Sequence, residues 1–271
     1  MTGISDENSP FLIETASLSA SYGKHAVLHD VSASFSKGEF VFLLGPNGSG
    51  KSTFLSILAG TEVPSLSITE GKCLLSGREV SSYSPLEKAR IRTFLPQNEM
   101  YSWNYTVLEA VRMGRYAQSK GVFSYSQEDN DASREALSKA GIAHLEDRFV
   151  FELSGGELQS VLIARSLAQN TPVMLLDEPF TSLDADKSDR LTKLLKGIVE
   201  SENKCVIMSI HDINCAPVFA DRILLFSEGK MIADGKPMDV FTAENLEKAY
   251  GTPFIQYTHP VFGVPQVCIK N

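Results

Sequence analysis

The residues that could most clearly do chemistry form the glycine-rich run 45–53, with the sequence GPNGSGKST. This run matches the pattern GxxxxGK[ST], follows the apolar run 40–44 and precedes a helical pattern at 54–59, which Gly60 closes. Glycines let successive backbone N–H groups turn toward phosphate oxygens, and the start of a helix adds its dipole. The order of strand, loop and helix predicts a phosphate-binding loop (P-loop). The residues expected to bind a nucleotide there are Gly45, Pro46, Asn47, Gly48, Ser49, Gly50, Lys51, Ser52 and Thr53.

Two polar residues of this loop have specific expected roles. Lys51 can carry its ammonium group to the β- and γ-phosphates, and the Ser52 hydroxyl can ligate Mg²⁺. A metal bound there needs an acidic partner, and Asp177 and Glu178 supply a pair of acids after the apolar run 173–176. We expect Asp177 to hold the metal shell and Glu178 to act as general base on the attacking water. The competing interpretation, an acidic helix cap after a strand, is weak beside a P-loop.

A second candidate anion site lies at 153–157, with the sequence LSGGE, ahead of the helical run 158–169. Serine and two glycines at a helix start expose N–H groups that can hold an anion. By itself such a start is usually a plain helix cap. One nucleotide needs only one P-loop, however. A second helix N-terminus that can bind phosphate in the same chain therefore requires an explanation.

Together these segments resemble the ATP-binding subunits of ABC transporters, and the resemblance covers nearly the whole chain. In that family the LSGGE signature of one subunit closes over the ATP that the P-loop of another subunit holds. The resemblance therefore implies an ATP hydrolase that uses ATP and Mg²⁺ and works as a homodimer with two ATP molecules at its interface. The signature residues that would bind nucleotide across that interface are Ser154, Gly155, Gly156 and Glu157.

Single residues extend the resemblance to other positions of the family's ATP site. Tyr22 stands where an aromatic residue stacks on adenine, and Asp184, in the run SLD, matches the D-loop aspartate at the dimer interface. Gln97 occupies the position of the glutamine that contacts Mg²⁺ and the attacking water and senses the membrane part. His211 matches the switch histidine that contacts the γ-phosphate, so both are implied to be catalytic together with the general base. One departure is Ser160, where the family commonly has arginine.

The rest of the chain supplies the elements that must position these residues. Short apolar runs alternate with longer helical patterns, which predicts an α/β fold with a mainly parallel sheet. From about Phe11 to Phe35 apolar and polar residues alternate more regularly, which indicates an antiparallel β part added to the main sheet. The strands predicted for the main sheet are 40–44, 93–95, 173–176, 205–209 and 223–226.

The middle of the chain lacks a strand pattern. We predict that 98–152 forms an α-helical subdomain inserted into a P-loop ATPase core made of 1–97 and 153–271. Two capping boxes mark helix starts, Thr106 with Glu109 and Ser126 with Asp129. A short cytoplasmic helix of a membrane partner is expected to dock in a groove beside Gln97, Met100, Tyr101 and Trp103.

Composition excludes several other classes of protein. The 271 residues carry 25 basic and 33 acidic side chains, a net charge of −8, which argues against a nucleic-acid partner. Apolar runs fall far short of the ~20 residues that a membrane-spanning helix needs. The four cysteines are widely spaced, which fits neither a disulfide framework nor a zinc site and favours a reducing cytoplasm.

Weaker motifs resemble the importer branch for iron-siderophores, haem and vitamin B12. They are VRMGRY at 111–116, HDIN at 211–214, ADR at 220–222 and the tail 249–265. The resemblance implies integral-membrane permease subunits as partners, indirectly a substrate-binding protein, and a peripheral location at the cytoplasmic face of the membrane. Zinc and manganese importers share several of these motifs, and an exporter subunit stays open. A non-transport ABC ATPase is disfavoured by the single ATPase head, the acidic charge and the lack of extended heptads.

Overall fold

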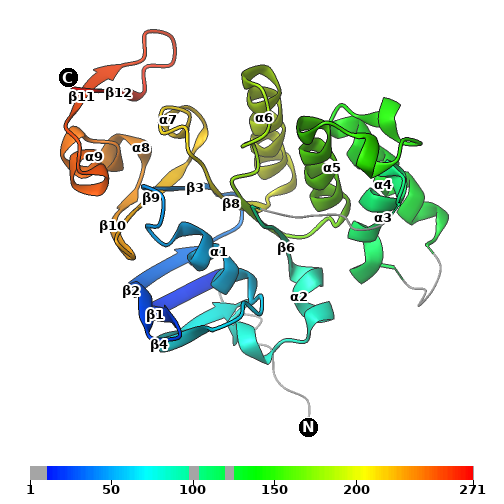
Figure 1. Cartoon of the computed structure of the whole chain (residues 1–271), viewed down its shortest axis with the longest axis horizontal. Coiled ribbons are helices and arrows are strands. Elements are labelled where there is room, and N and C mark those ends of the chain that lie inside the picture. The colour runs from blue at the N-terminus through cyan, green and yellow to red at the C-terminus, as the bar shows by residue number, and fades with distance from the viewer. Residues whose placement is uncertain (1–10, 98–103, 120–124, 271) are drawn as a thin grey trace.

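The main β-sheet presents the strand ends from which most of the predicted site residues come. The computed structural model describes residues 11–97, 104–119 and 125–270 (Figure 1). The sheet consists of β3 (Phe40–Leu44), β6 (Arg92–Leu95), β7 (Val173–Asp177), β8 (Cys205–Ser209), β9 (Arg222–Ser227) and β10 (Lys230–Gly235). Its order is β10-β9-β3-β8-β7-β6, with β10 antiparallel to β9 and all other neighbours parallel. The five predicted strands are confirmed, with ends that differ by at most one residue.

Two apolar layers cover the two faces of this sheet. All residues of β3, β7 and β8 are buried, as expected for parallel strands that are covered on both sides. Alternate side chains of β3 belong to opposite layers. Val41 and Leu43 pack with helix α1 (Lys51–Ala59) and the N-terminal strands, whereas Phe40 and Phe42 pack with the helices of the other layer.

The predicted N-terminal antiparallel β part is confirmed, but its strands form a sheet of their own and do not join the main sheet. This sheet contains β1 (Ile13–Tyr22), β2 (His25–Phe35), β4 (Leu66–Leu75) and β5 (Arg78–Glu79). Its order is β2-β1-β4-β5, all antiparallel. Apolar residues of β1, such as Ile13 and Leu18, share a core with α1, so side-chain packing joins the two sheets. The sequence does not predict β4, because most of its side chains are exposed and lack apolar alternation.

Between β6 and β7 the described chain is helical. It contains α3 (Val107–Arg112), η2 (Met113–Ala117), α4 (Gln127–Lys139), η3 (Ala143–Leu145), η4 (Val150–Glu152) and α5 (Gly155–Ala168). Both predicted capping boxes are present, because Thr106 accepts the N–H of Glu109 and Ser126 accepts that of Asp129. Apolar residues of α3, α4 and α5 join the core on one face of the main sheet. The division into an ATPase core and a helical subdomain at 98–152 stays a prediction.

Further helices and a C-terminal hairpin complete the fold. The helices are η1 (Val80–Ser82), α2 (Pro85–Ile91), α6 (Ala185–Glu202), α7 (Ala216–Phe219), α8 (Pro237–Val240) and α9 (Ala243–Tyr250). The hairpin pairs β11 (Phe254–Thr258) with β12 (Pro265–Ile269) and stands beyond α9, at the opposite end of the molecule from α3 and α4 (Figure 1). The four cysteines are free thiols.

In the described ranges, no helix combines the length and the apolar character that crossing a bilayer requires. Three residues predicted to line a docking groove, Met100, Tyr101 and Trp103, lie outside the described residues.

Candidate nucleotide-binding and hydrolysis site

Close backbone approaches fix the shape of the P-loop. Gly45 has φ +142°, and a Cβ atom added there would lie 2.2 Å from the carbonyl oxygen of Phe226. Gly50 directly precedes α1 with φ +104°, and a Cβ there would lie 2.7 Å from Leu28 Cδ2. Only glycine fits both positions, because L side chains disfavour such φ values and the neighbouring atoms leave no room. These two glycines therefore let the backbone of the loop pass close to Phe226 and Leu28 just before α1 begins.

The predicted phosphate-binding side chains lie inside this loop. Lys51 is buried, and its Nζ donates to the carbonyl oxygens of Gly45 at 2.8 Å and Pro46 at 3.0 Å. Burial lowers the pKa of Lys51, while the charges of Glu178 and Asp177 oppose the shift. A cavity of about 520 Å³ opens beside the amine. It is lined by His25, Val27, Asn47, Gly48, Ser49, Gly50, Lys51, Ser52, Thr53, Gln97, Glu178 and His211.

One hydroxyl, that of Ser209, organises the acid pair. It donates to Asp177 Oδ1 at 2.6 Å and accepts the backbone N–H of Glu178 at 2.9 Å. Burial raises the pKa of Asp177, while hydrogen bonds from Ser209 and Ser52 oppose the rise. Ser209 was not predicted as a site residue from the sequence. Its only local signal is a polar residue at the end of an apolar strand, two positions before His211.

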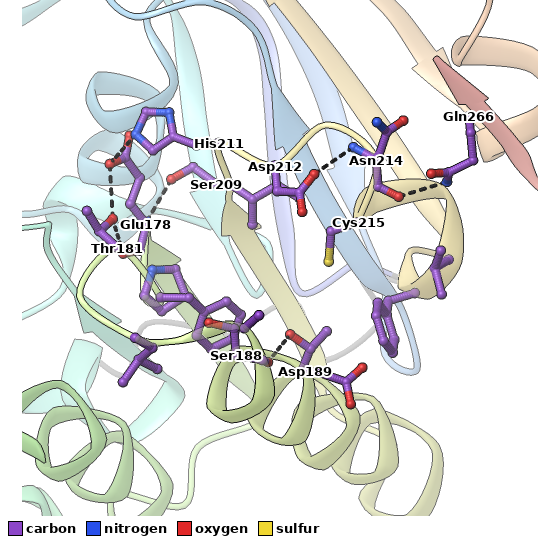
Figure 2. Close-up of a pocket in the computed structure, with 18 of the residues that line it drawn as sticks. Glu178, Thr181, Ser188, Asp189, Ser209, His211, Asp212, Asn214, Cys215 and Gln266 are labelled. Carbon is purple, nitrogen blue, oxygen red and sulfur yellow. Dashed lines mark hydrogen bonds and ion pairs between the residues drawn. The ribbon is translucent and has the colours of Figure 1, made fainter. Parts of the chain in front are cut away.

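The three residues predicted to be catalytic meet at one oxygen atom. Gln97 donates from Nε2 to Glu178 Oε2 at 2.6 Å, and His211 Nε2 lies 2.6 Å from the same oxygen. Figure 2 shows this contact of His211, with Thr181 on the other side of the glutamate. Glu178 is buried and has φ +50°, a left-handed conformation that costs a non-glycine residue roughly 1–2 kcal/mol. Such strain is characteristic of functional sites.

The signature residues lie away from the P-loop cavity of their own chain. Ser154 caps α5, and its hydroxyl and N–H exchange hydrogen bonds with Glu157. Hydrogen bonds from Ser154 lower the pKa of Glu157. Gly156 packs against Ser182, since an added Cβ would lie 3.1 Å from the Ser182 carbonyl oxygen. None of the four signature residues lines the cavity beside Lys51.

Two other predicted positions, Tyr22 and Asp184, and the departure at Ser160 do not line the cavity beside Lys51. Tyr22 ends β1 beside the P-loop, with its hydroxyl 3.5 Å from Thr53 Oγ1. Asp184 is exposed and caps α6 by accepting the N–H of Lys187 at 2.9 Å. Ser160 is buried and donates to the carbonyl of Gly156 at 3.0 Å, so it closes the first turn of the signature helix.

A second cavity, of about 590 Å³, begins at Glu178 and His211 (Figure 2). It runs between the start of α6 and the loop that joins β8 to α7, and it ends at the C-terminal hairpin, where His259, Phe262 and Gln266 line it. Glu178 therefore lines two cavities, one on the P-loop side and one on the hairpin side.

This arrangement of the P-loop, Lys51 and Glu178 can bind the phosphates of a nucleotide and place a carboxylate beside them. Residues 28–181, more than half of the chain, match the family model described as ABC transporter. The chain therefore belongs to the ABC transporter family, and it is an ATP hydrolase of that family.

Relatives match nearly the whole chain. The ferric enterobactin transport ATP-binding protein FepC of Escherichia coli (strain K12) is 36% identical over 250 residues, which cover 92% of this chain and 91% of FepC. The petrobactin import ATP-binding protein FpuD of Bacillus anthracis is 34% identical over 96% of this chain and 93% of its own length. The hemin import ATP-binding protein HmuV of Nocardia farcinica (strain IFM 10152) is 36% identical over 89% of this chain and 81% of its own.

Solved structures of the family share the fold. One comes from an inward-facing transporter described as being of the metal-chelate type, with a TM-score of 0.81, 26% identity, and coverage of 96% of this chain and 98% of that one. Another is the dimeric post-hydrolysis state of the ATP-binding cassette MJ0796 bound to ADP and Pi, with a TM-score of 0.74 and 29% identity over 83% of this chain and 98% of that one. The predicted α/β ATPase fold is confirmed.

Proposed function

We propose that this chain hydrolyses ATP to power a membrane importer for an iron-siderophore, haem or cobalamin complex. The observation that carries the proposal is the meeting of Gln97, Glu178 and His211 at one carboxylate oxygen beside the P-loop. The cargo class rests on relatives named for ferric enterobactin, petrobactin and hemin. Cobalamin rests on the resemblance of the weaker sequence motifs to the importer branch.

The P-loop cavity fits a triphosphate with a bound metal ion. The glycine conformations leave room for a close backbone approach, and the buried hydroxyl of Ser49 has no hydrogen-bond partner within the described part of the chain. Ser52, Gln97 and Asp177 would hold Mg²⁺, and Ser52 and Asp177 already share a hydrogen bond. The ion would neutralise charge on the β- and γ-phosphates. The Lys51 ammonium group would add a positive charge beside the same phosphates.

Glu178 would act as general base on the attacking water. In the described state Gln97 and His211 both contact its Oε2, so they must move aside before this oxygen can accept a proton. His211 is half exposed and can turn toward the γ-phosphate. Ser209 holds the backbone of Glu178 at 2.9 Å while the side chain changes partners. Tyr22, at the end of β1, would stack on the adenine.

A second copy of the chain would complete the site. Ser154 and the glycines after it form an exposed helix start that does not line the cavity of their own chain. In a head-to-tail homodimer this helix start would close over the ATP held by the partner's P-loop, with Asp184 at the interface. The dimer would sit at the cytoplasmic face of the membrane on permease subunits, which receive cargo from a substrate-binding protein.

Transport in reconstituted vesicles tests the proposal. The chain, its permease and its substrate-binding protein are supplied in turn with labelled ferric siderophore, haem, cobalamin, zinc and manganese, and the Glu178→Gln subunit serves as the inactive control. We expect ATP-dependent uptake of one of the first three cargoes and none with the control. Uptake of zinc or manganese alone, or transport in the outward direction, would contradict the proposed cargo or direction.

A further inference from the structure

The C-terminal hairpin is hydrogen-bonded to the loop that carries His211. Asn214, in that loop, pairs with the backbone of Val267 in β12: its Nδ2 donates to the Val267 carbonyl at 3.0 Å, and its Oδ1 accepts the Val267 N–H at 2.9 Å. Gln266, which is buried, donates from Nε2 to the carbonyl of Asn214 at 2.9 Å (Figure 2). Three hydrogen bonds thus tie one loop residue to one strand.

The ring of His211 depends on this loop for its position. Its side chain is 49% exposed, so packing around the ring does little to orient it. Asp212 Oδ1 accepts the N–H of Asn214 at 3.0 Å, which fixes the turn between His211 and Asn214 (Figure 2). The 590 Å³ cavity runs along this loop, with residues of α6 on its other side. The backbone from β8 to Asn214, together with the 2.6 Å contact of Nε2 with Glu178 Oε2, therefore sets where the imidazole lies.

The same C-terminal segment also reaches the P-loop. Tyr250, the last residue of α9, accepts the N–H of Gly45 on its hydroxyl oxygen at 3.1 Å. Its ring meets Phe254, the first residue of β11, edge-on with centroids 5.9 Å apart. One segment, from Tyr250 to Val267, therefore contacts both the loop that holds the phosphates and the loop that carries the switch histidine.

We infer that Asn214 and Gln266 are positioning residues that set His211 relative to the P-loop, with the C-terminal hairpin as their support. The inference rests on the proposed role of His211 at the γ-phosphate. The hairpin lies outside residues 28–181, which the family model matches. A displacement of about 1 Å in a reacting group can slow a step about 100-fold. ATP affinity, which the P-loop supplies, does not depend on this contact.

Steady-state ATP hydrolysis by the full chain tests the inference. Gln266→Glu keeps the size of the side chain and removes the N–H donor, and Asn214→Ala removes both side-chain bonds to Val267. We expect each to lower kcat by about 10- to 100-fold and to leave the KM for ATP unchanged. Ile255→Thr, at an exposed position of β11 away from Asn214, is the matched control and keeps the wild-type kcat.

The same substitutions in a His211→Ala background separate positioning from folding. Residues that act only through His211 have nothing left to position there, so Gln266→Glu and Asn214→Ala should cause no further loss of kcat. Equal losses in both backgrounds, or a rise in KM that matches the fall in kcat, would overturn the inference. An unchanged kcat in the two variants, with His211→Ala slow, would also overturn it and leave the proposed function standing. A wild-type rate for His211→Ala would instead refute the proposed role of His211.

Discussion

Ser209 donates its hydroxyl proton to Asp177 Oδ1 at 2.6 Å, across the parallel pairing of β8 with β7. The Ser209 hydroxyl oxygen also accepts the backbone N–H of Glu178 at 2.9 Å. One small side chain therefore holds the proposed metal ligand and the proposed general base in a fixed relation.

Replacing this hydroxyl should change the pH dependence of hydrolysis. The hydrogen bond from Ser209 stabilises the carboxylate of Asp177 and opposes the rise in pKa that burial causes. In Ser209→Ala the pKa of Asp177 rises further, so less of it is ionised at a given pH. We expect the acid limb of the rate profile to move to higher pH and half-maximal rate to require more Mg²⁺. Ser201→Ala, on the exposed side of α6, is the control, and an acid limb that stays in place would refute this role.

Complementation between two inactive subunits tests the composite site. Lys51→Ala loses the phosphate-binding amine, and Ser154→Arg blocks the signature helix start. Each variant alone should be inactive as a homodimer. A mixture should recover part of the wild-type ATPase rate, because each heterodimer has one intact P-loop facing one intact signature. A mixture as inactive as its components would argue against sites shared between subunits.

A buried ion pair links helices that follow β6. Arg115 Nε donates to Asp129 Oδ1 at 3.2 Å, with side chains 10% and 4% exposed, and Nη1 donates to the Ala168 carbonyl at 3.0 Å. Burial raises the pKa of Asp129, but hydrogen bonds from Ser126 and the charge of Arg115 outweigh burial, so the pKa lies below its ordinary value. Asp129→Asn should lower the free energy of unfolding by about 3–5 kcal/mol at pH 7, as for a broken buried pair.

Urea unfolding at several pH values measures this effect and checks its sign. Because the folded-state pKa of Asp129 is depressed, its contribution is complete above the unfolded value of about 3.9 and fades as pH falls through the folded value. The difference between wild type and Asp129→Asn should therefore be constant down to about pH 4 and shrink only below it. Glu146→Gln breaks the exposed pair with Arg134 and should cost at most about 1 kcal/mol. A loss no larger than this for Asp129→Asn would contradict the prediction.

Two glycines in helices give opposite predictions. An alanine Cβ at Gly114 would lie 2.4 Å from the carbonyl oxygen of Arg165 in α5, so Gly114→Ala should cost about 1–3 kcal/mol through overpacking. Gly197 lies inside α6 with nothing within 4 Å of an added Cβ. Gly197→Ala should stabilise the protein by about 0.5–1 kcal/mol, because alanine favours helix. Thermal unfolding compares the two, and changes of the same sign would refute this account of the packing at Gly114.

Sequence patterns correctly predicted the features that are formed by residues close together in the chain. The P-loop follows from one run of residues, and the strand ends and capping boxes follow from neighbours a few positions apart. The weaker importer motifs have structural roles that the sequence does not reveal. Arg115 joins α4 to α5, and Asn214 joins the loop that carries His211 to β12.

What the sequence did not predict depends on pairing between distant segments. Ser209 meets Asp177 only because β7 and β8 pair in that register. Gln266 reaches Asn214 only because the hairpin folds back on the loop after β8. The separate N-terminal sheet includes β4, whose exposed polar side chains lack the alternation that marks a strand. The two residues of each of these pairs, Asp177 with Ser209 and Asn214 with Gln266, lie too far apart in the sequence for a local pattern to contain both.

Glu178 is the proposed general base of this ATPase. Steady-state ATP hydrolysis by Glu178→Gln, beside MgATP binding by the same protein, tests this most directly. The amide keeps the size of the side chain and the contacts around it but cannot accept the proton of the attacking water. We predict that MgATP still binds and that kcat falls by about 10²–10⁴-fold. Turnover close to that of the wild type, with MgATP bound, would contradict the claim.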